Sequence, residues 1–319
     1  MRRKYREGGT GRTVRGALVC VLMTALSAPA AAADGPGSAG ALYLRLPVSA
    51  RSIAMGEASA GLGSDPFGWL ANPGATGTGV TTGAGIFHSQ WLMDTYYDNV
   101  ALSRKAGPIF DLRLGLTYFS APEVQGYDGA GLPTIALDNS NFQGILGIGA
   151  SPVGGVGLGV NLKYFQETIA DWTASGFALD AGATVSIPVP DITLGVSVRN
   201  LGPKISFISH EEELPLTVTV GGAFERPLLP GLLGWTIAAD AVMPRHEETY
   251  AAVGTALTIR DVFTIRAGFN GENEREDSGV TAGGGVNILG RAWLDYAWTP
   301  YGDLGNFHRV SIFFSLGGE

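Results

Sequence analysis

The chain offers few residues whose types and spacing could carry out catalysis. Its four histidines lie in separate segments, at His88, His210, His246 and His308, with no His-x-x-x-His pair. No Gly-x-Ser-x-Gly elbow and no phosphate-binding Gly-Lys-Ser/Thr loop is present. His88 and Ser89 are neighbours, but consecutive residues of a strand point to opposite faces and cannot act together. We therefore expect no catalytic residues and no enzymatic activity.

Two acidic runs, at 211–213 and 272–277, are the only candidates for a metal site. They lack the alternating Asp/Asn spacing of a dedicated Ca²⁺ loop. We interpret both runs as solvated loops. The sequence thus predicts no metal and no cofactor.

The elements that would position any functional residue are strands. Residues 306–316 alternate with a period of two almost to the end of the chain. One face is apolar (Val310, Ile312, Phe314, Leu316), and the other is polar except for one ring (Arg309, Ser311, Phe313, Ser315). This pattern is typical of a sheet with lipid on one side and a wet lumen on the other.

Similar alternation recurs along the chain, in about fourteen segments between residues 82 and 316. Glycine contributes 48 of 319 residues, and charged residues make up only 16%. No run beyond the N-terminus approaches the ~18 apolar residues of a spanning helix. We predict an all-β fold, a transmembrane antiparallel up-and-down β-barrel of about 14 strands over residues 81–319. Alternation alone leaves a soluble β-sandwich or propeller as the alternative.

The N-terminus has the composition of a secretory signal. Basic residues precede an apolar run at 16–26, and Ala31-Ala32-Ala33 offers a cleavage site. We assign residues 1–33 to a cleaved signal peptide that removes the only cysteine, Cys20. The formal charge of the whole chain is −8, which argues against nucleic acid as a partner.

Connection lengths predict an orientation. The short connections are 105–109, 151–154, 188–190, 260–261 and 289–290, and the longer ones are 120–139, 167–174, 200–215, 243–248, 270–277 and 299–306. Outer-membrane barrels typically have short periplasmic turns and long extracellular loops. The connection 225–233 is an exception, because it is long for a periplasmic turn. We expect a bacterial outer-membrane protein with both termini in the periplasm and with lipid or lipopolysaccharide around its wall.

Three groups of motifs resemble a known family. They are RSIAMG at 51–56 with Asp65-Pro66 and Asn72-Pro73-Gly74, NLGPKI at 200–205 with Glu213-Leu214-Pro215, and YAWTPYGDLG at 296–305 with His308-Arg309. Together they resemble the PorV/PorQ family of outer-membrane proteins, which are related to FadL-type barrels. The chain departs from that pattern at Gly74-Ala75, where Ala-Gly is usual, and at Glu57, where glycine is usual.

The resemblance implies roles for two parts of the chain. Residues 34–80 would fold back into the lumen as a hatch with Asn72, Pro73 and Gly74 as its pivot; the alternative is a loosely held periplasmic arm. As a PorV-type accessory of type IX-like secretion, the barrel would dock secreted cargo or translocon components. Outer-loop anchors for such partners are Phe207, Ile208 and Tyr301. The alternative, implied by the FadL relation, is a channel for a hydrophobic small molecule.

The predicted lumen face is rich in charge. Its charged members are Arg113, Lys163, Asp180, Arg199, Asp240, Arg266, Arg291, Asp295 and Arg309. They could form a mutually neutralising network that braces the wall, or a track for a ligand. Inward aromatic residues suited to a greasy substrate are few: Phe119, Phe165, Trp293 and Phe313.

Overall fold

The computed structural model describes residues 38–63, 65–76, 82–91, 94–187, 191–207, 210–272, 278–288 and 290–316. The predicted signal peptide, with Cys20, lies outside these residues. Fourteen antiparallel strands close into a barrel in which each strand pairs with its neighbours and β1 pairs with β16. The prediction of an all-β barrel of about 14 strands is therefore confirmed.

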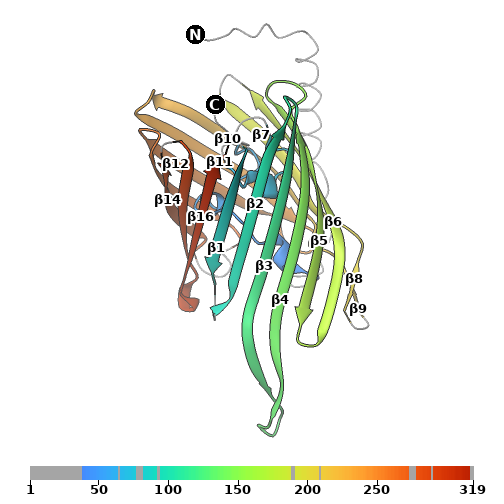
Figure 1. Cartoon of the computed structure of the whole chain (residues 1–319). Coiled ribbons are helices and arrows are strands. Elements are labelled where there is room, and N and C mark those ends of the chain that lie inside the picture. Colours follow the sequence, from blue (N-terminus) through green and yellow to red (C-terminus); the bar gives the residue numbers. More distant parts are fainter. Residues whose placement is uncertain are drawn as a thin grey trace.

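The barrel strands follow one another along the chain around the wall (Figure 1). They are β1 (Gly83–Gln90), β2 (Tyr96–Ala106), β3 (Phe110–Tyr127), β4 (Pro133–Ala150), β5 (Val156–Ile169), β6 (Trp172–Ile187), β7 (Ile192–Leu201), β10 (Thr217–Leu229), β11 (Leu233–Pro244), β12 (Tyr250–Ile259), β13 (Phe263–Asn270), β14 (Val280–Ile288), β15 (Ala292–Pro300) and β16 (Asn306–Ser315). A separate two-stranded sheet, β8 (Ile205–Phe207) with β9 (His210–Glu212), fills part of the connection from β7 to β10.

Side chains alternate between the two faces of the wall as the sequence predicts. On β16, Arg309, Ser311 and Phe313 are buried inside, whereas Phe314 is 50% exposed on the outside. Along β3, exposed leucines alternate with buried Asp111, Arg113 and Thr117. Exposed apolar side chains in this pattern give the barrel an outer face suited to lipid.

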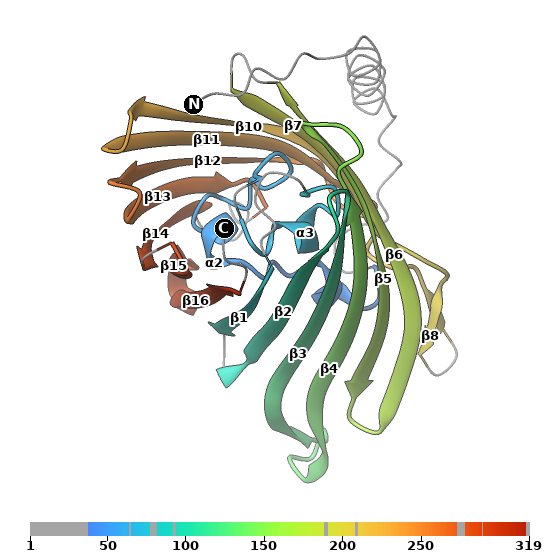
Figure 2. The same ribbon diagram turned by 45° about the horizontal axis from the view of Figure 1, so that its top comes forward.

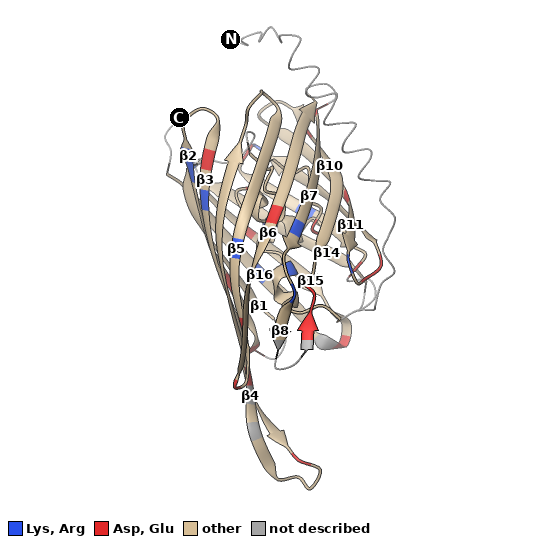
Figure 3. Cartoon of the chain, turned by 90° about the vertical axis from the view of Figure 1, so that its right-hand side faces the viewer, with Lys and Arg blue, Asp and Glu red and all other residues tan. Residues whose placement is uncertain are grey.

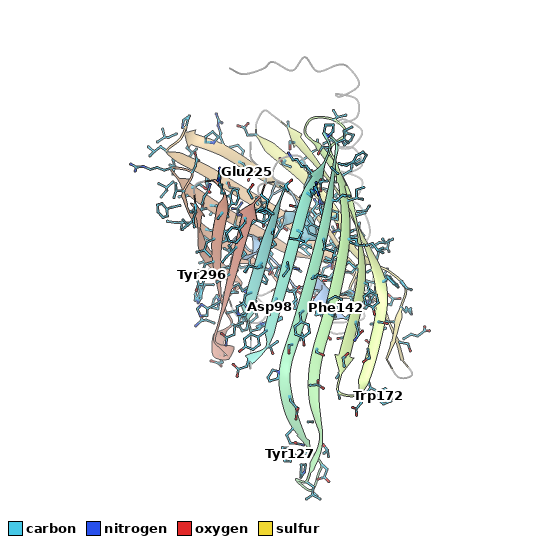
Figure 4. The ribbon with its side chains drawn as sticks, viewed as in Figure 1. Asp98, Tyr127, Phe142, Trp172, Glu225 and Tyr296 are labelled. Carbon is cyan, nitrogen blue, oxygen red and sulfur yellow. The ribbon has the colours of Figure 1, made fainter. Side chains whose placement is uncertain are left out.

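Several connections predicted as loops belong to strands. Most of 120–139 continues β3 and β4 as a hairpin that projects beyond the rest of the barrel, with Tyr127 at its tip (Figure 4). Strands β5 and β6 likewise leave only two residues between them, and β10 and β11 leave three. The strands continue into these segments, so the loop boundaries predicted at 120–139, 167–174 and 225–233 are wrong.

Two ends of the barrel can be distinguished by their connections. We call the end that carries the connections β2–β3, β4–β5, β6–β7, β10–β11, β12–β13 and β14–β15 the turn end, and the end from which the β3–β4 hairpin projects the loop end. In Figure 4, Glu225 lies toward the turn end, and Tyr127 marks the loop end.

The helices of the described residues are short and lie inside the ring of strands, apart from η4 (Gly302–Leu304) between β15 and β16. They are η1 (Leu42–Arg45), α2 (Ala50–Ile53) and α3 (Gly68–Ala71), and Figure 2 shows α2 and α3 within the barrel. Of the described helices, none is both long enough and apolar enough to cross a membrane. We call the described residues from Ser38 to Thr76 the plug.

Candidate functional site

The plug has its own compact local structure. The Ser49 hydroxyl oxygen accepts a 3.2 Å hydrogen bond from the Ser52 N–H and so caps α2. The same hydroxyl donates to Asp65, which also accepts a 2.9 Å bond from the Phe67 N–H at the start of α3. One carboxylate thereby joins the two helices. Burial raises the pKa of Asp65.

The predicted pivot lies against the wall. Within the turn, Asn72 Oδ1 accepts from the Gly74 N–H at 2.9 Å, and Asn72 Nδ2 donates to the Ala60 carbonyl at 2.8 Å. From the wall, Arg113 Nη1 donates to the Pro73 carbonyl and Thr184 Oγ1 to the Gly74 carbonyl, both at 2.7 Å. The turn is thus held by two strands, and its action as a pivot stays a prediction.

Glycines on the inner face let the plug backbone approach the wall. A Cβ atom at Gly195 would lie 1.8 Å from the Ala60 carbonyl oxygen, and one at Gly159 would lie 2.0 Å from that of Pro73. No side chain fits at such distances without a shift of the backbone. These glycines are functional positions that the sequence reasoning missed, although the high glycine content was a usable signal.

Polar side chains also bind the plug on β11 and on the connections after β11 and β13. Asp240 Oδ2 accepts from the backbone N–H groups of Ser59 and Ala60, at 2.7 and 2.8 Å. Arg45, at the end of η1, forms ion pairs with Glu247 and Glu272. The plug is therefore tied to β3, β6, β11 and the connections after β11 and β13.

The charged residues predicted for the lumen lie mostly where expected. Seven are buried on the inner face (Arg113, Lys163, Asp180, Asp240, Arg266, Asp295, Arg309), and Arg199 is half-buried. Lys163 pairs with Asp180 at 2.8 Å, and Arg266 with Asp295 at 2.7 Å. Most of the remaining wall carries neither sign of charge (Figure 3).

Arg291 departs from the predicted placement. It lies in the turn that contains Gly290, whose φ is 68°, and it is exposed at the turn end. Strand β15 begins one residue later, at Ala292, so the alternation that assigned Arg291 to the lumen does not extend to it.

A cavity lies between the plug and the inner faces of strands β2 to β5, β7 and β10 to β12. It provides about 60 Å³ of space for the centres of water molecules, enough for a few waters or one small polar group. Leu46 and Phe67 of the plug and Ile145 of β4 form apolar parts of its lining. Glu57 of the plug and Arg199 of β7 also line it, so the cavity combines apolar surface with charge.

Glu57 has an unusual backbone angle and a carboxyl group with a raised pKa. Its φ is 69°, in the left-handed region that favours glycine. Burial, aided by the nearby Glu272 carboxylate, raises the pKa of Glu57 to about 7. The sequence reasoning noted the departure from glycine at Glu57 but gave it no role.

Aromatic side chains lead from the loop end toward this cavity. Trp91 packs edge-on against Phe307 and Phe119, with ring centroids 5.8 and 6.4 Å apart. Phe119 in turn packs against Tyr97, which lines the cavity and donates a 3.2 Å hydrogen bond to the Leu46 carbonyl. Of the other predicted inward aromatics, Phe165 and Phe313 are buried and Trp293 packs against Phe313 at 6.0 Å.

The predicted partner-binding residues do not form one described cluster. Tyr301 packs on Phe307, with centroids 4.4 Å apart, beside the aromatic path. Phe207 ends β8, where its backbone pairs with that of His210, and Ile208 lies outside the described residues. The second acidic run, 272–277, is described only at Glu272, which pairs with Arg45.

The histidine neighbours behave as the strand geometry requires. His88 is on the outer face, where its Nδ1 atom lies 2.6 Å from Asp98 Oδ1, whereas Ser89 is buried on the inner face. Among the residues that the structure describes, no group of three His, Cys, Asp or Glu side chains could hold a metal ion.

Comparisons with known proteins agree with this architecture. No family model and no curated protein matches the chain. Among solved structures, it is similar to the Ralstonia pickettii toluene transporter TbuX (12% identity, TM-score 0.56, 82% of this chain and 95% of that one). It is also similar to a Pseudomonas aeruginosa FadL homologue (10% identity, TM-score 0.54, 85% and 99%) and to the CymD monoaromatic hydrocarbon channel (10% identity, TM-score 0.60, 85% and 98%). The chain therefore shares the fold of FadL-like barrels, and nothing in these comparisons supports the narrower resemblance to PorV/PorQ.

Proposed function

We propose that this protein is an outer-membrane channel for small hydrophobic molecules. The observation that carries the proposal is the aromatic path from Trp91 and Phe307 at the loop end to the cavity beside the plug. The titles of similar structures name a toluene transporter and a monoaromatic hydrocarbon channel, which supports the same class of substrate.

The geometry suggests how such a channel would work. Trp91 and Phe119, which are partly exposed at the loop end, offer a hydrophobic molecule a surface on which to leave water. The docked plug would deny water and ions an open pore while the molecule moves along Phe119 and Tyr97 to the cavity. Release would require the plug to shift, and the hydrogen bonds from Arg113 and Thr184 are the contacts to be broken near the predicted pivot.

The membrane and the orientation belong to the same proposal. The exposed apolar outer face favours lipid as its surroundings, and the short connections at the turn end favour the periplasm on that side. Lipopolysaccharide would then surround the loop end.

Docking of secreted cargo or translocon components through Phe207, Ile208 and Tyr301 is the second proposal. No contact of the described residues favours it over transport, and Tyr301 packs on a ring of the aromatic path. We therefore rank the secretion role below the channel.

Uptake measurements test the channel. Cells that produce the protein should take up radiolabelled toluene faster than cells that lack it, and the double substitution Trp91→Ser/Phe307→Ser should reduce that uptake severalfold. Tyr127→Ser, at the hairpin tip where the ring is 66% exposed, is the matched control and should leave uptake unchanged. Equal uptake with and without the protein, together with co-purification of secreted proteins, would favour the docking role instead.

A further inference from the structure

Two side chains of opposite charge line the cavity without a direct hydrogen bond or ion pair to any described residue. Among the described residues, neither the Glu57 carboxylate nor the Arg199 guanidinium makes a hydrogen bond or an ion pair, and Arg199 Nε is enclosed. They come from different parts of the molecule, Glu57 from the plug and Arg199 from β7. Partly buried charges without partners are costly, so their presence at one cavity calls for an explanation.

The other charged groups around the cavity are already satisfied. Arg45 pairs with Glu247 and Glu272, and Lys163 pairs with Asp180. Asp65 accepts hydrogen bonds from Ser49 and from the Phe67 N–H. The charged side chains that remain are Glu57 and Arg199. When Glu57 is ionised, the charges of these two side chains cancel.

The backbone conformation of Glu57 is a second indication that its side chain has a functional role. A non-glycine residue with a φ of 69° is strained relative to an ordinary backbone conformation. Glycine would avoid this strain, yet the chain places a carboxylate here and directs it toward the cavity. An observed outlier of this kind is a reason to look for a functional role.

We propose that Glu57 and Arg199 bind the hydroxyl group of an uncharged amphiphile such as a phenol or an alcohol. The hydroxyl would donate to the Glu57 carboxylate and accept from the Arg199 guanidinium, while the apolar part lies along Leu46, Phe67 and Ile145. Because the cavity beside the docked plug has room for only a few waters, such a ligand enters as the plug shifts. This deepens the proposed function, on which it rests, by naming the substrate class.

The same chemistry discriminates against two other classes. A plain hydrocarbon fits the apolar surface but leaves both charged groups without a partner, which a polar site penalises strongly. A carboxylate would satisfy Arg199 but would place a second negative charge beside Glu57. The preferred ligand is therefore hydroxylated and neutral.

Three probes of matched size test the inference: p-cresol, toluene and p-toluate. Their dissociation constants would be measured by equilibrium dialysis against the purified barrel in detergent at pH 8.5, corrected for partition into empty micelles. We expect p-cresol to bind at least about tenfold more tightly than toluene or p-toluate, the effect of one satisfied hydrogen bond to a charged group.

Two variants identify the groups responsible. Glu57→Met and Arg199→Met should each abolish the preference for p-cresol while toluene binds as before, and Arg226→Met, an exposed arginine, should change nothing. Heat-modifiable migration in gels verifies that each barrel is folded. Equal binding of p-cresol and toluene to the unaltered protein, or tightest binding of p-toluate, would overturn this inference alone. Failure of all three probes to bind, with no toluene uptake by cells, would overturn the proposed function as well.

Discussion

Arg113, on the barrel wall, donates a 2.7 Å hydrogen bond from Nη1 to the carbonyl oxygen of Pro73 in the plug. The arginine side chain is almost completely buried and also pairs with Asp111 on its own strand. While the plug is docked, water cannot replace Asp111 or the Pro73 carbonyl as a partner of the buried Arg113 guanidinium. Arg113 therefore favours one position of the plug.

Replacing Arg113 should loosen the plug. In Arg113→Met, the Pro73 carbonyl loses its donor and buried Asp111 loses its ion-pair partner, a change that costs about 3 to 5 kcal/mol in comparable buried pairs. Planar-bilayer recordings should show more frequent or larger openings. Arg226→Met removes only an exposed arginine, and identical conductance in the two variants would contradict the role of Arg113.

A single methyl group should displace the plug at another point. Gly195→Ala places a Cβ atom 1.8 Å from the Ala60 carbonyl oxygen, so the plug backbone must move. Limited proteolysis should then cleave the plug faster, with the barrel still folded. The control is Gly144→Ala on the same barrel, where the nearest atom would be 3.7 Å away. Equal protease resistance of the two variants would show that the plug does not depend on this close approach.

The position of the membrane can be tested with two leucines of equal exposure. Leu146 on the β4 wall is 63% exposed, and Leu132 near the tip of the hairpin is 62% exposed. Leu146→Arg should cost ~2 to 4 kcal/mol if it faces lipid near the midplane, and the yield of assembled barrel should fall. Leu132→Arg should assemble normally because it projects beyond the wall. Assembly yields that match would mean that lipid does not cover the Leu146 face.

Plug docking should depend on pH through Glu57. Its pKa rises from an ordinary 4.5 to about 7 in the docked plug, so docking binds the proton and is favoured below the ordinary pKa. The advantage is lost as the pH rises through about 7, against the opposing attraction of Arg45, Arg199 and Arg309. Openings in bilayers should therefore be rarer at pH 5.5 than at pH 8.5. Glu57→Met should reduce this difference, and a full pH response in that variant would assign it to other groups.

Much of the fold could be predicted from the sequence because a barrel strand shows its two faces locally. The alternation over β16 placed Arg309 inside and Phe314 outside from neighbouring residues alone. Alternation does not show where a strand leaves the wall, because it continues into the projecting β3–β4 hairpin. It also does not show where a strand begins, because β15 starts at Ala292, one residue after Arg291. Pattern indicates the direction of a side chain but not where the wall ends.

The candidate site was less accessible to sequence reasoning. Glu57 and Arg199 are 142 positions apart and share a cavity only because the plug enters a closed barrel. Their lack of partners is also a property of the folded molecule, since Lys163 had the same predicted role and is fully paired. The departure from glycine at Glu57 was visible, but its meaning required the backbone angle and the cavity.

The ion pairs of Arg45 have a consequence for the order of assembly. Its partners Glu247 and Glu272 lie 202 and 227 positions further along the chain, near β11 to β13. Contacts over such separations form only after the intervening chain has been organised, because the entropy of closing a long loop must be overcome first. We expect the plug, although it precedes every strand of the barrel in the chain, to dock last. We therefore expect a newly closed barrel to pass through a stage in which the plug is not yet docked in its lumen.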